Sequence, residues 1–125
     1  CIVVAVDAKK VDNSKWEVFT HGGRKPSGKN VIDYVREVEK MGAGEILLTF
    51  IEFDGTGKGY NLDIINQFEK SISIPLIISG GAGSKDDVLN LLSFAFADPK
   101  INSTMSDNTC LRVDFYDIHV ICVFV

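Results

Sequence analysis

Long apolar runs are missing from this sequence, and none approaches the roughly 18 residues that a membrane-spanning helix needs. We expect no secretory signal, because the apolar residues 1–6 are not preceded by basic residues and meet Asp7 at once. The net charge of −4 gives no electrostatic reason to expect binding to nucleic acid or to an anionic membrane. We therefore expect a soluble, cytoplasmic protein that has neither nucleic acid nor membrane as a partner.

Cysteine and histidine are scarce, and their spacing is not that of a ligand set. The three cysteines, Cys1, Cys110 and Cys122, form no Cys-x-x-Cys pair, so we expect reduced thiols rather than disulfides or a zinc site. Neither His21 nor His119 has a partner in the sequence that would indicate a catalytic triad. We predict no metal and no cofactor.

What remains is an ordinary globular composition, with 46% hydrophobic and 24% charged residues. At 125 residues the chain is long enough for one hydrophobic core, and we predict a single domain over residues 1–125. The chain is short for a complete α/β barrel, which typically takes about 250 residues.

Three short apolar segments predict buried strands, at residues 1–6, 45–51 and 76–78. The first is continuously apolar, so we expect it to be buried on both faces and to end at Asp7. A strand at the first residue indicates either part of something larger or a first strand that pairs with a partner.

Helical patterns follow these strands. Asn30 is the expected N-cap of a first helix, and Asn61 or Leu62 opens a second. Ser84, with Asp87 three residues later, resembles a capping box at the start of a third helix. Strands and helices that alternate with short connections predict an α/β fold of right-handed βαβ units with a parallel sheet.

Between the first strand and the first helix, the turn-forming residues 12–14 precede residues 16–19, which we expect to form the second arm of a small hairpin. Residues 20–28 read as a loop because they are rich in glycine and polar residues. The cations Arg24, Lys25 and Lys29 either meet an anion or are simply solvated.

Polar residues stand at the carboxyl ends of all three predicted parallel strands, where α/β sheets bind ligands. Asp7 is either a general acid or base or a cap on backbone amides. After the second strand, Asp54 and Gly55 form a common turn dipeptide, but Gly55 also lets backbone approach a ligand and Thr56 can donate to a phosphate. Convergence of three such segments on one end of the sheet favours a site.

The third segment is Ser79, Gly80 and Gly81, within the glycine-rich residues 79–83 that precede a helix N-terminus. Unpaired N–H groups and the helix dipole attract anions there. The segment is neither a Walker P-loop nor the dinucleotide-binding pattern. We predict that it binds the phosphate of a sugar phosphate, and the alternative is a simple glycine turn.

Four segments together resemble one family in their order and spacing: Val-Val-Ala-Val-Asp-Ala-Lys-Lys (3–10), Gly-Ala-Gly-Glu-Ile-Leu-Leu-Thr (42–49), Asp-Gly-Thr with Gly-Tyr (54–60) and Ser-Gly-Gly-Ala-Gly (79–83). They are similar to the C-terminal half of the cyclase subunit of imidazole glycerol phosphate synthase, a (βα)8 barrel of histidine biosynthesis. The resemblance covers about residues 1–95. Residues 20–23 also resemble paralogues of that cyclase associated with surface-polysaccharide amination.

The resemblance implies a TIM-barrel-type half-barrel with parallel strands over residues 1–97 and an atypical, divergent tail over residues 98–125. It implies cyclisation and C–N cleavage of a phosphoribulosyl aminoimidazole nucleotide, with ammonia from a glutaminase subunit. Asp7 matches that half's catalytic acid or base, and Asp54 matches a second acid on the same rim. The expected phosphate-binding residues are Gly55, Thr56, Ser79, Gly80 and Gly81.

The departures from the family are as informative as the matches. The N-terminal half-barrel is missing, Phe50 stands where the family usually has a small polar residue, and Glu52 with Phe53 replaces the usual Asp-Arg. The β-prone tail at residues 111–125 does not resemble the family's last strand and has to be buried, paired with another chain or prone to aggregate.

An open parallel sheet with an unpaired first strand predicts self-association, as a homodimer or higher homo-oligomer. The rival to a cyclase is a non-catalytic phosphosugar-binding or structural half-barrel. A third candidate is an open flavodoxin-like sheet that binds a nucleotide with the same glycine loops.

Overall fold

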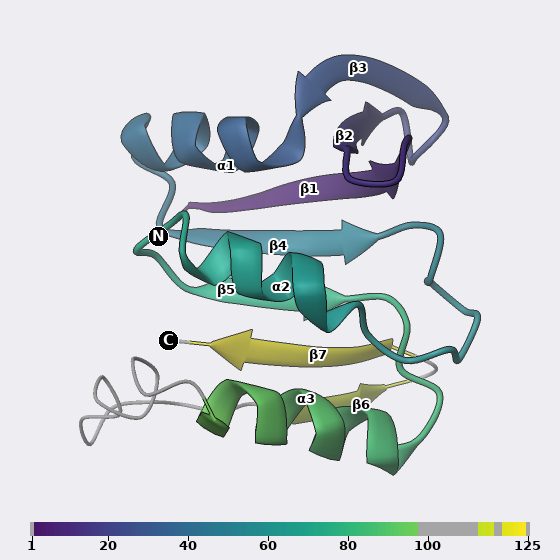
Figure 1. Cartoon of the computed structure of the whole chain (residues 1–125). Helices are drawn as coiled ribbons and strands as arrows, with labels where there is room; N and C mark the ends of the chain where they lie inside the picture. Colours follow the sequence, from purple (N-terminus) through teal and green to yellow (C-terminus); the bar gives the residue numbers. More distant parts are fainter. Residues whose placement is uncertain (1, 98–112, 117–118, 125) are drawn as a thin grey trace.

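The computed structural model describes residues 2–97, 113–116 and 119–124, which form one mixed sheet and three helices (Figure 1). The seven strands lie in the order β3-β2-β1-β4-β5-β7-β6. The strands are β1 (Val3–Lys10), β2 (Trp16–Thr20), β3 (Lys25–Asn30), β4 (Glu45–Phe50), β5 (Leu76–Ser79), β6 (Val113–Tyr116) and β7 (His119–Phe124). The helices are α1 (Val31–Lys40), α2 (Leu62–Glu69) and α3 (Lys85–Ala97).

The three strands expected from the apolar segments form the centre of the sheet. β1 pairs with β4 and β4 with β5, both in parallel. The prediction of a parallel sheet is confirmed for these strands only, because antiparallel β2 and β3 flank β1 while antiparallel β7 and β6 flank β5. The fold is therefore α/β with a mixed sheet.

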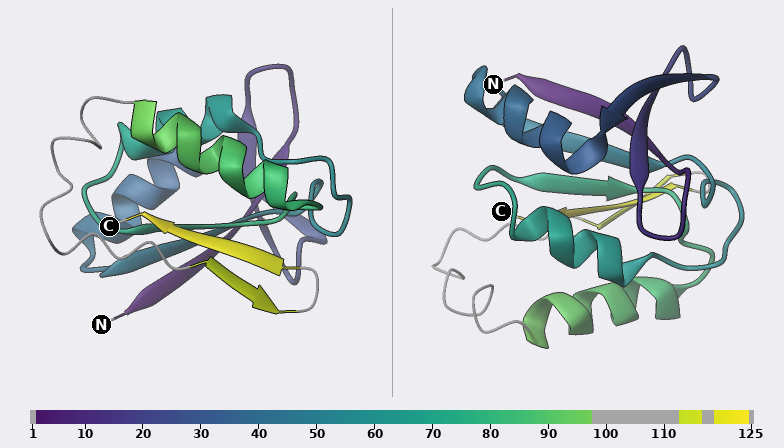
Figure 2. Two further views of the ribbon diagram at one scale, coloured as in Figure 1. Left: turned by 90° about the horizontal axis from the view of Figure 1, so that it is seen from below. Right: turned by 45° about the horizontal axis from the view of Figure 1, so that its top comes forward.

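All three helices lie on one side of the sheet, as the left view of Figure 2 shows. Burial alternates along the central strands as a result, with Val6, Leu48 and Ile78 buried on the helix side. The expectation that the first strand is buried on both faces is wrong, since Val3 and Ala5 on the other side are exposed. No described helix covers that second face, which we call the uncovered face.

The first strand is also longer than expected. β1 continues through Asp7 to Lys10, because residues 7–10 pair with β2 and complete the hairpin that the sequence predicted. The expected loop at residues 20–28 is wrong in its second half, where β3 begins at Lys25 and pairs with β2. β1 is therefore paired on both sides over residues 7–8, and only its first half, residues 3–6, has no described strand opposite β4.

The helix boundaries follow the predicted caps. The Asn30 side chain accepts hydrogen bonds from the N–H groups of Ile32 (2.9 Å) and Asp33 (3.3 Å) at the start of α1. α1 ends in a Schellman motif, in which Ala43 N–H donates to the carbonyl of Val38 and Gly42 has φ +100°. Asn61 caps α2.

Phe50 is the centre of the core between the sheet and the helices, and its side chain is fully buried. Its ring meets Trp16 edge-on at 5.1 Å between centroids and Phe68 of α2 at 6.4 Å. The unexpected aromatic at this position therefore ties β4 to the hairpin and to α2.

The β-prone tail forms β6 and β7, and β7 pairs antiparallel with the outer edge of β5. The expected pairing with another chain is not what the structure shows, because β7 pairs with β5 and β6 of the same chain. Cys1 and Cys110 lie outside the described residues. None of the helices in the described part of the chain is long and apolar enough to cross a membrane.

Replacing Phe50 by alanine should lower the free energy of unfolding by about 3–5 kcal/mol, because a fully buried phenylalanine leaves a cavity that its neighbours fill only in part. Urea denaturation measures the loss. Leu89→Ala on the exposed face of α3 is the matched control and should change stability by less than about 0.5 kcal/mol. A Phe50→Ala loss as small as that of the control would contradict the central position of this ring.

Candidate functional site

The carboxyl ends of β1, β4 and β5, with the segments that follow them, form what we call the rim. Register aligns one polar residue from each strand: Asp7 pairs with Thr49, and Thr49 pairs with Ser79. All three are half-buried on the uncovered face, since their neighbours in sequence point toward the helices. The structure thus brings Asp7 and Ser79 into one row and adds Thr49, which the sequence reading missed.

Thr49 had a recognisable signal, as the only hydroxyl in the apolar run of β4. A polar residue inside a buried strand is unusual unless its side faces a site or solvent. The row Asp7–Thr49–Ser79 therefore places a carboxylate and two hydroxyls side by side across three strands.

Residues 51–56, which we call the aspartate turn, carry Asp54 above the end of β4. The carbonyl of Phe50 accepts hydrogen bonds from the N–H groups of Phe53 (2.9 Å) and Asp54 (3.1 Å). Gly55 follows with φ +70°, a conformation that favours glycine. The Asp54 residue is exposed.

Thr56 closes this turn rather than facing outward as a donor. Its hydroxyl donates to the carbonyl of Phe53 at 2.7 Å, and its N–H donates to the same oxygen at 3.0 Å. The hydroxyl oxygen also accepts from Lys58 N–H at 3.4 Å. To donate to a phosphate, Thr56 would have to leave the Phe53 carbonyl.

The glycine loop, residues 79–83, packs directly against the segment that follows the aspartate turn. A Cβ on Gly80 would lie 2.8 Å from the carbonyl oxygen of Phe50 and 3.4 Å from the Asp54 nitrogen. Gly59 N–H donates to the Gly81 carbonyl at 2.7 Å, and a Cβ on Gly83 would lie 2.5 Å from the Gly57 Cα. The two loops therefore form one unit that only glycine permits.

The N-terminus of α3 differs from the anion site that the sequence predicted. Asp87 accepts hydrogen bonds from the N–H groups of Gly83 and Ser84, each at 2.9 Å, and Ser84 caps Asp87 N–H in return. This confirms the capping box. The Gly83 N–H in the first place, and the Ser84 hydroxyl and N–H with it, hold the pKa of Asp87 below its ordinary value.

The amides one step earlier in the chain are not engaged by this cap. The N–H groups of Gly55, Gly80 and Gly81 donate no hydrogen bond to any residue that the structure describes. Gly80 and Gly81 are buried and have φ of +91° and +120°. Buried N–H groups without a protein acceptor need a water molecule or an anion as their partner.

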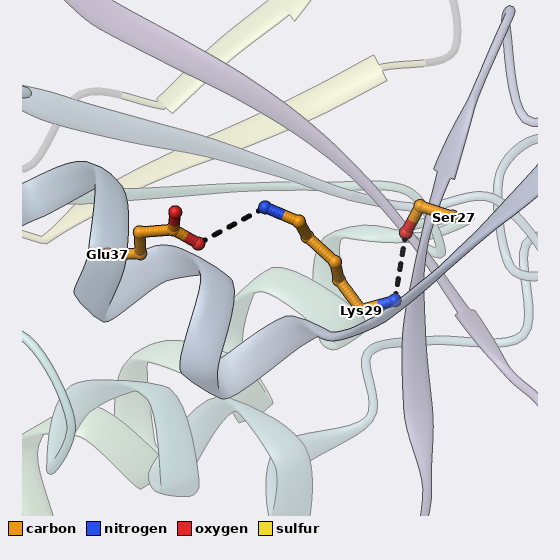
Figure 3. A network of polar contacts seen from close by, with 3 residues as sticks. All are labelled: Ser27, Lys29 and Glu37. Carbon is orange, nitrogen blue, oxygen red and sulfur yellow. Dashed lines mark hydrogen bonds and ion pairs between the residues drawn. The ribbon is translucent and has the colours of Figure 1, made fainter.

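The cationic cluster that the sequence singled out is largely engaged with its own surroundings. Lys29 pairs with Glu37 of α1 at 3.2 Å, and its N–H donates to the Ser27 hydroxyl (Figure 3). Arg24 donates to the carbonyl of His21 at 3.0 Å. The Lys29–Glu37 pair is about half exposed, so it contributes little to stability, and the cluster reads as a solvated surface.

The described residues contain no metal-binding cluster. In residues 2–97 and the two described tail strands, no group of three or more His, Cys, Asp or Glu side chains is placed to hold a metal ion. His21 sits at the tip of the β2–β3 hairpin with φ +56°, and its ring lies 3.0 Å from the Thr20 hydroxyl.

Gly83→Ala tests whether the two loops depend on close approach, because Gly83 has no positive φ and its cost would be steric alone. We expect hydrogen exchange of the Gly59 N–H, bonded to Gly81, to become about tenfold faster. Gly28→Ala is the matched control, since Gly28 has φ +77° but open space around its Cβ position. Equal Gly59 exchange in the wild type and the Gly83 variant would contradict the interlock.

Comparisons with known proteins show the family of this chain. The profile of a family described as "Histidine biosynthesis protein" matches residues 1–102. The imidazole glycerol phosphate synthase subunit HisF of Gluconacetobacter diazotrophicus is 52% identical over 84 residues, which cover 67% of this chain and 33% of that protein. HisF of Hyphomonas neptunium is 52% identical over 87 residues, 70% of this chain and 34% of that protein. The chain spans about a third of the length of these relatives, and it belongs to the histidine biosynthesis protein family.

Proposed function

We propose that this chain is a TIM-barrel-type half-barrel of an imidazole glycerol phosphate synthase cyclase, working on a phosphorylated ribosyl nucleotide in the cytoplasm. The family match and the named relatives support the chemistry. The parallel strands β1, β4 and β5, with helices on one side only, support the half-barrel. Residues 1–125 form a single domain in this proposal, with residues 1–97 family-like and residues 98–125 a divergent tail.

The observation that carries the proposal is the contact between Gly80 and the backbone of Asp54. The distance of 2.8 Å from the Gly80 Cβ position to the Phe50 carbonyl oxygen supports one site that includes both the acid and the glycine loop. Asp7 stands two strands away at the same end, in register with Thr49 and Ser79. A phosphate bound at the glycine loop would therefore hold the rest of a substrate across both acids.

In this proposal Gly80 and Gly81 bind one substrate phosphate through their N–H groups, assisted by the Gly55 N–H and the Ser79 hydroxyl. Thr56 joins them if its hydroxyl turns from the Phe53 carbonyl. Backbone donors suit this task because they are fixed in place before the anion arrives.

Asp7 and Asp54 move protons. Ring closure by ammonia and cleavage of a C–N bond each require a proton to be taken up at one atom and delivered to another. Asp7 acts as an acid or base from within β1, where strand pairing fixes its position. Asp54 acts as the second acid or base from the aspartate turn. Two carboxylates on separate elements let one donate while the other accepts.

The relatives are named as subunits, and we propose a glutaminase subunit that supplies ammonia as the partner. Histidine biosynthesis is the pathway we favour, since the family and the relatives carry that name. The non-catalytic phosphosugar-binding half-barrel is the second candidate. It is favoured by the length of the chain, about a third of its relatives, because a second half would bring further groups to the rim.

Asp7→Asn separates these two functions, because it keeps the shape of the side chain and removes its proton transfer. With ammonium as the nitrogen source, we expect turnover of the phosphoribulosyl nucleotide to fall by about 10²-fold or more, while binding of the nucleotide stays within about twofold. Asp33→Asn, an exposed acid in the first turn of α1, is the control and should retain turnover. A wild-type chain that binds the nucleotide without turnover would decide for the non-catalytic half-barrel.

We also propose that the chain self-associates as a homodimer through its uncovered face and the first half of β1. Ile2 and Val3 are 66% and 49% exposed, and no described strand pairs with residues 3–6 on the side away from β4. A partly unpaired apolar strand invites another strand. The outer edge of β5 does not offer this, because β7 already pairs there. Two copies could therefore complete a barrel only if β7 left that edge.

Light scattering coupled to gel filtration should give about twice the chain mass of 13.7 kDa at concentrations of about 10 µM and above. Val3→Lys puts a charge on the open edge and should shift the protein toward monomer. Val11→Lys is the matched control, a valine of similar exposure in the β1–β2 loop, and should leave the dimer intact. A clean monomer of the wild type at these concentrations would rule out the assembly.

A further inference from the structure

The aspartate turn is tied to the β2 hairpin by a pair of stacked rings. The ring of Phe53 lies parallel to that of Trp16, with 6.4 Å between centroids and an interplanar angle of 28°. Trp16 is buried at the start of β2 and also meets the core ring of Phe50 edge-on. Phe53 therefore connects the segment that carries Asp54 to the interior of the protein.

The backbone of Phe53 holds the same turn from within. Its N–H donates to the Phe50 carbonyl, and its carbonyl accepts both the N–H and the hydroxyl of Thr56. Its Cβ also lies 3.5 Å from the position of a Cβ on Gly81, which places it beside the glycine loop. One residue thus contacts the hairpin, the turn and the anion-binding loop.

Two hydrogen bonds to β1 also anchor the start of the turn: Ile51 N–H donates to the Ala8 carbonyl at 3.1 Å, and Lys10 N–H donates to the Glu52 carboxylate at 3.2 Å. Residues 54–58 are exposed, and nothing lies within 4 Å of a Cβ on Gly55. Exposed backbone with few packed side chains opens easily, so the direction of Asp54 and of the Gly55 N–H depends on the residues that are anchored. Phe53 is the half-buried side chain next to Asp54, and its ring contact is made outside the rim.

We propose that Phe53, stacked on Trp16, is the positioning residue of the rim, and that it sets the affinity of the glycine loop for phosphate by holding the aspartate turn against it. Phe53 does not touch the ligand. The stacked pair makes the hairpin part of the site, because displacement of Trp16 moves Phe53 and with it the turn. This inference rests on the proposed phosphate site.

Phe53→Leu is the main test, because leucine keeps an apolar side chain and loses the stack. Amide hydrogen exchange should become about tenfold faster at Asp54, whose N–H is bonded to the Phe50 carbonyl, and should stay within about twofold at Leu48 in buried β4. The dissociation constant for inorganic phosphate should rise about three- to tenfold. Trp16 is the sole tryptophan, so its fluorescence follows the titration in the same samples.

Two further variants serve as controls. Phe53→Tyr keeps the ring and should restore wild-type exchange and phosphate affinity. Tyr34→Leu removes a half-buried ring on α1, where Lys29 lies 5.1 Å from it, and should leave Asp54 exchange and phosphate binding unchanged. If Phe53→Leu also speeds exchange at Leu48, the core has loosened, and Phe53→Met, whose unbranched flexible side chain adapts better to the space of the ring, takes its place in the comparison.

Unchanged Asp54 exchange in both Phe53→Leu and Phe53→Met would overturn the positioning role, as would an equal effect in Tyr34→Leu. Faster Asp54 exchange with unaltered phosphate affinity would also overturn it, because the ring pair would then support the turn without setting the site. A wild type that binds no phosphate would instead refute the proposed phosphate site, and the exchange data would still report on the stack.

Discussion

The close approach of two loops is the constraint on which the rim depends. Gly80 lies under the Phe50 carbonyl, and Gly83 lies against Gly57, at distances that no side chain could occupy. Backbone that approaches this closely leaves little freedom for either loop, so the ends of β4 and β5 behave as one unit. The arrangement also brings backbone N–H groups close together where no side chain fits, which suits the proposed anion site. The glycines of these loops are thus needed for close backbone packing as well as for turn geometry.

The second constraint is a sheet with helices on one side. Burial of alternate residues toward α1, α2 and α3 forces the other residues of β1, β4 and β5 onto the uncovered face, where Asp7 and Ser79 stand in register with Thr49. The same geometry that aligns these polar groups leaves Ala5, Leu47 and Ile77 in the next row without a described layer above them. Site and assembly surface are thus two ends of one face, which is why the proposed function and the proposed dimer are linked.

Sequence patterns predicted the parts of the fold that depend on local chemistry. Three apolar strands, the caps at Asn30 and Asn61 and the capping box at Ser84 were all recognisable, because each depends on residues close in the chain. β3 was not, since its sequence Lys-Pro-Ser-Gly-Lys-Asn is polar and it forms an edge strand through pairing with β2 alone. The antiparallel position of β7 and the continuation of β1 past Asp7 likewise depend on partners distant in sequence. The alignment of Thr49 with Asp7 was also not predictable from the sequence, because it depends on the register between β1 and β4.

Each departure from the family pattern, taken singly, suggests a loss of function. Phe50 and Phe53 replace a small polar residue and an arginine in the pattern that the sequence resembles, yet in the structure they form one cluster with Trp16 that holds the aspartate turn. The exchange removes a cation beside Asp54 and leaves Lys58 as the only basic residue in residues 51–60. An anion at the proposed site would interact with fixed backbone dipoles as well as with lysines, and the dipoles act only where the loops are held in place. If the proposed site binds phosphate, its affinity therefore depends on the rigidity of the turn.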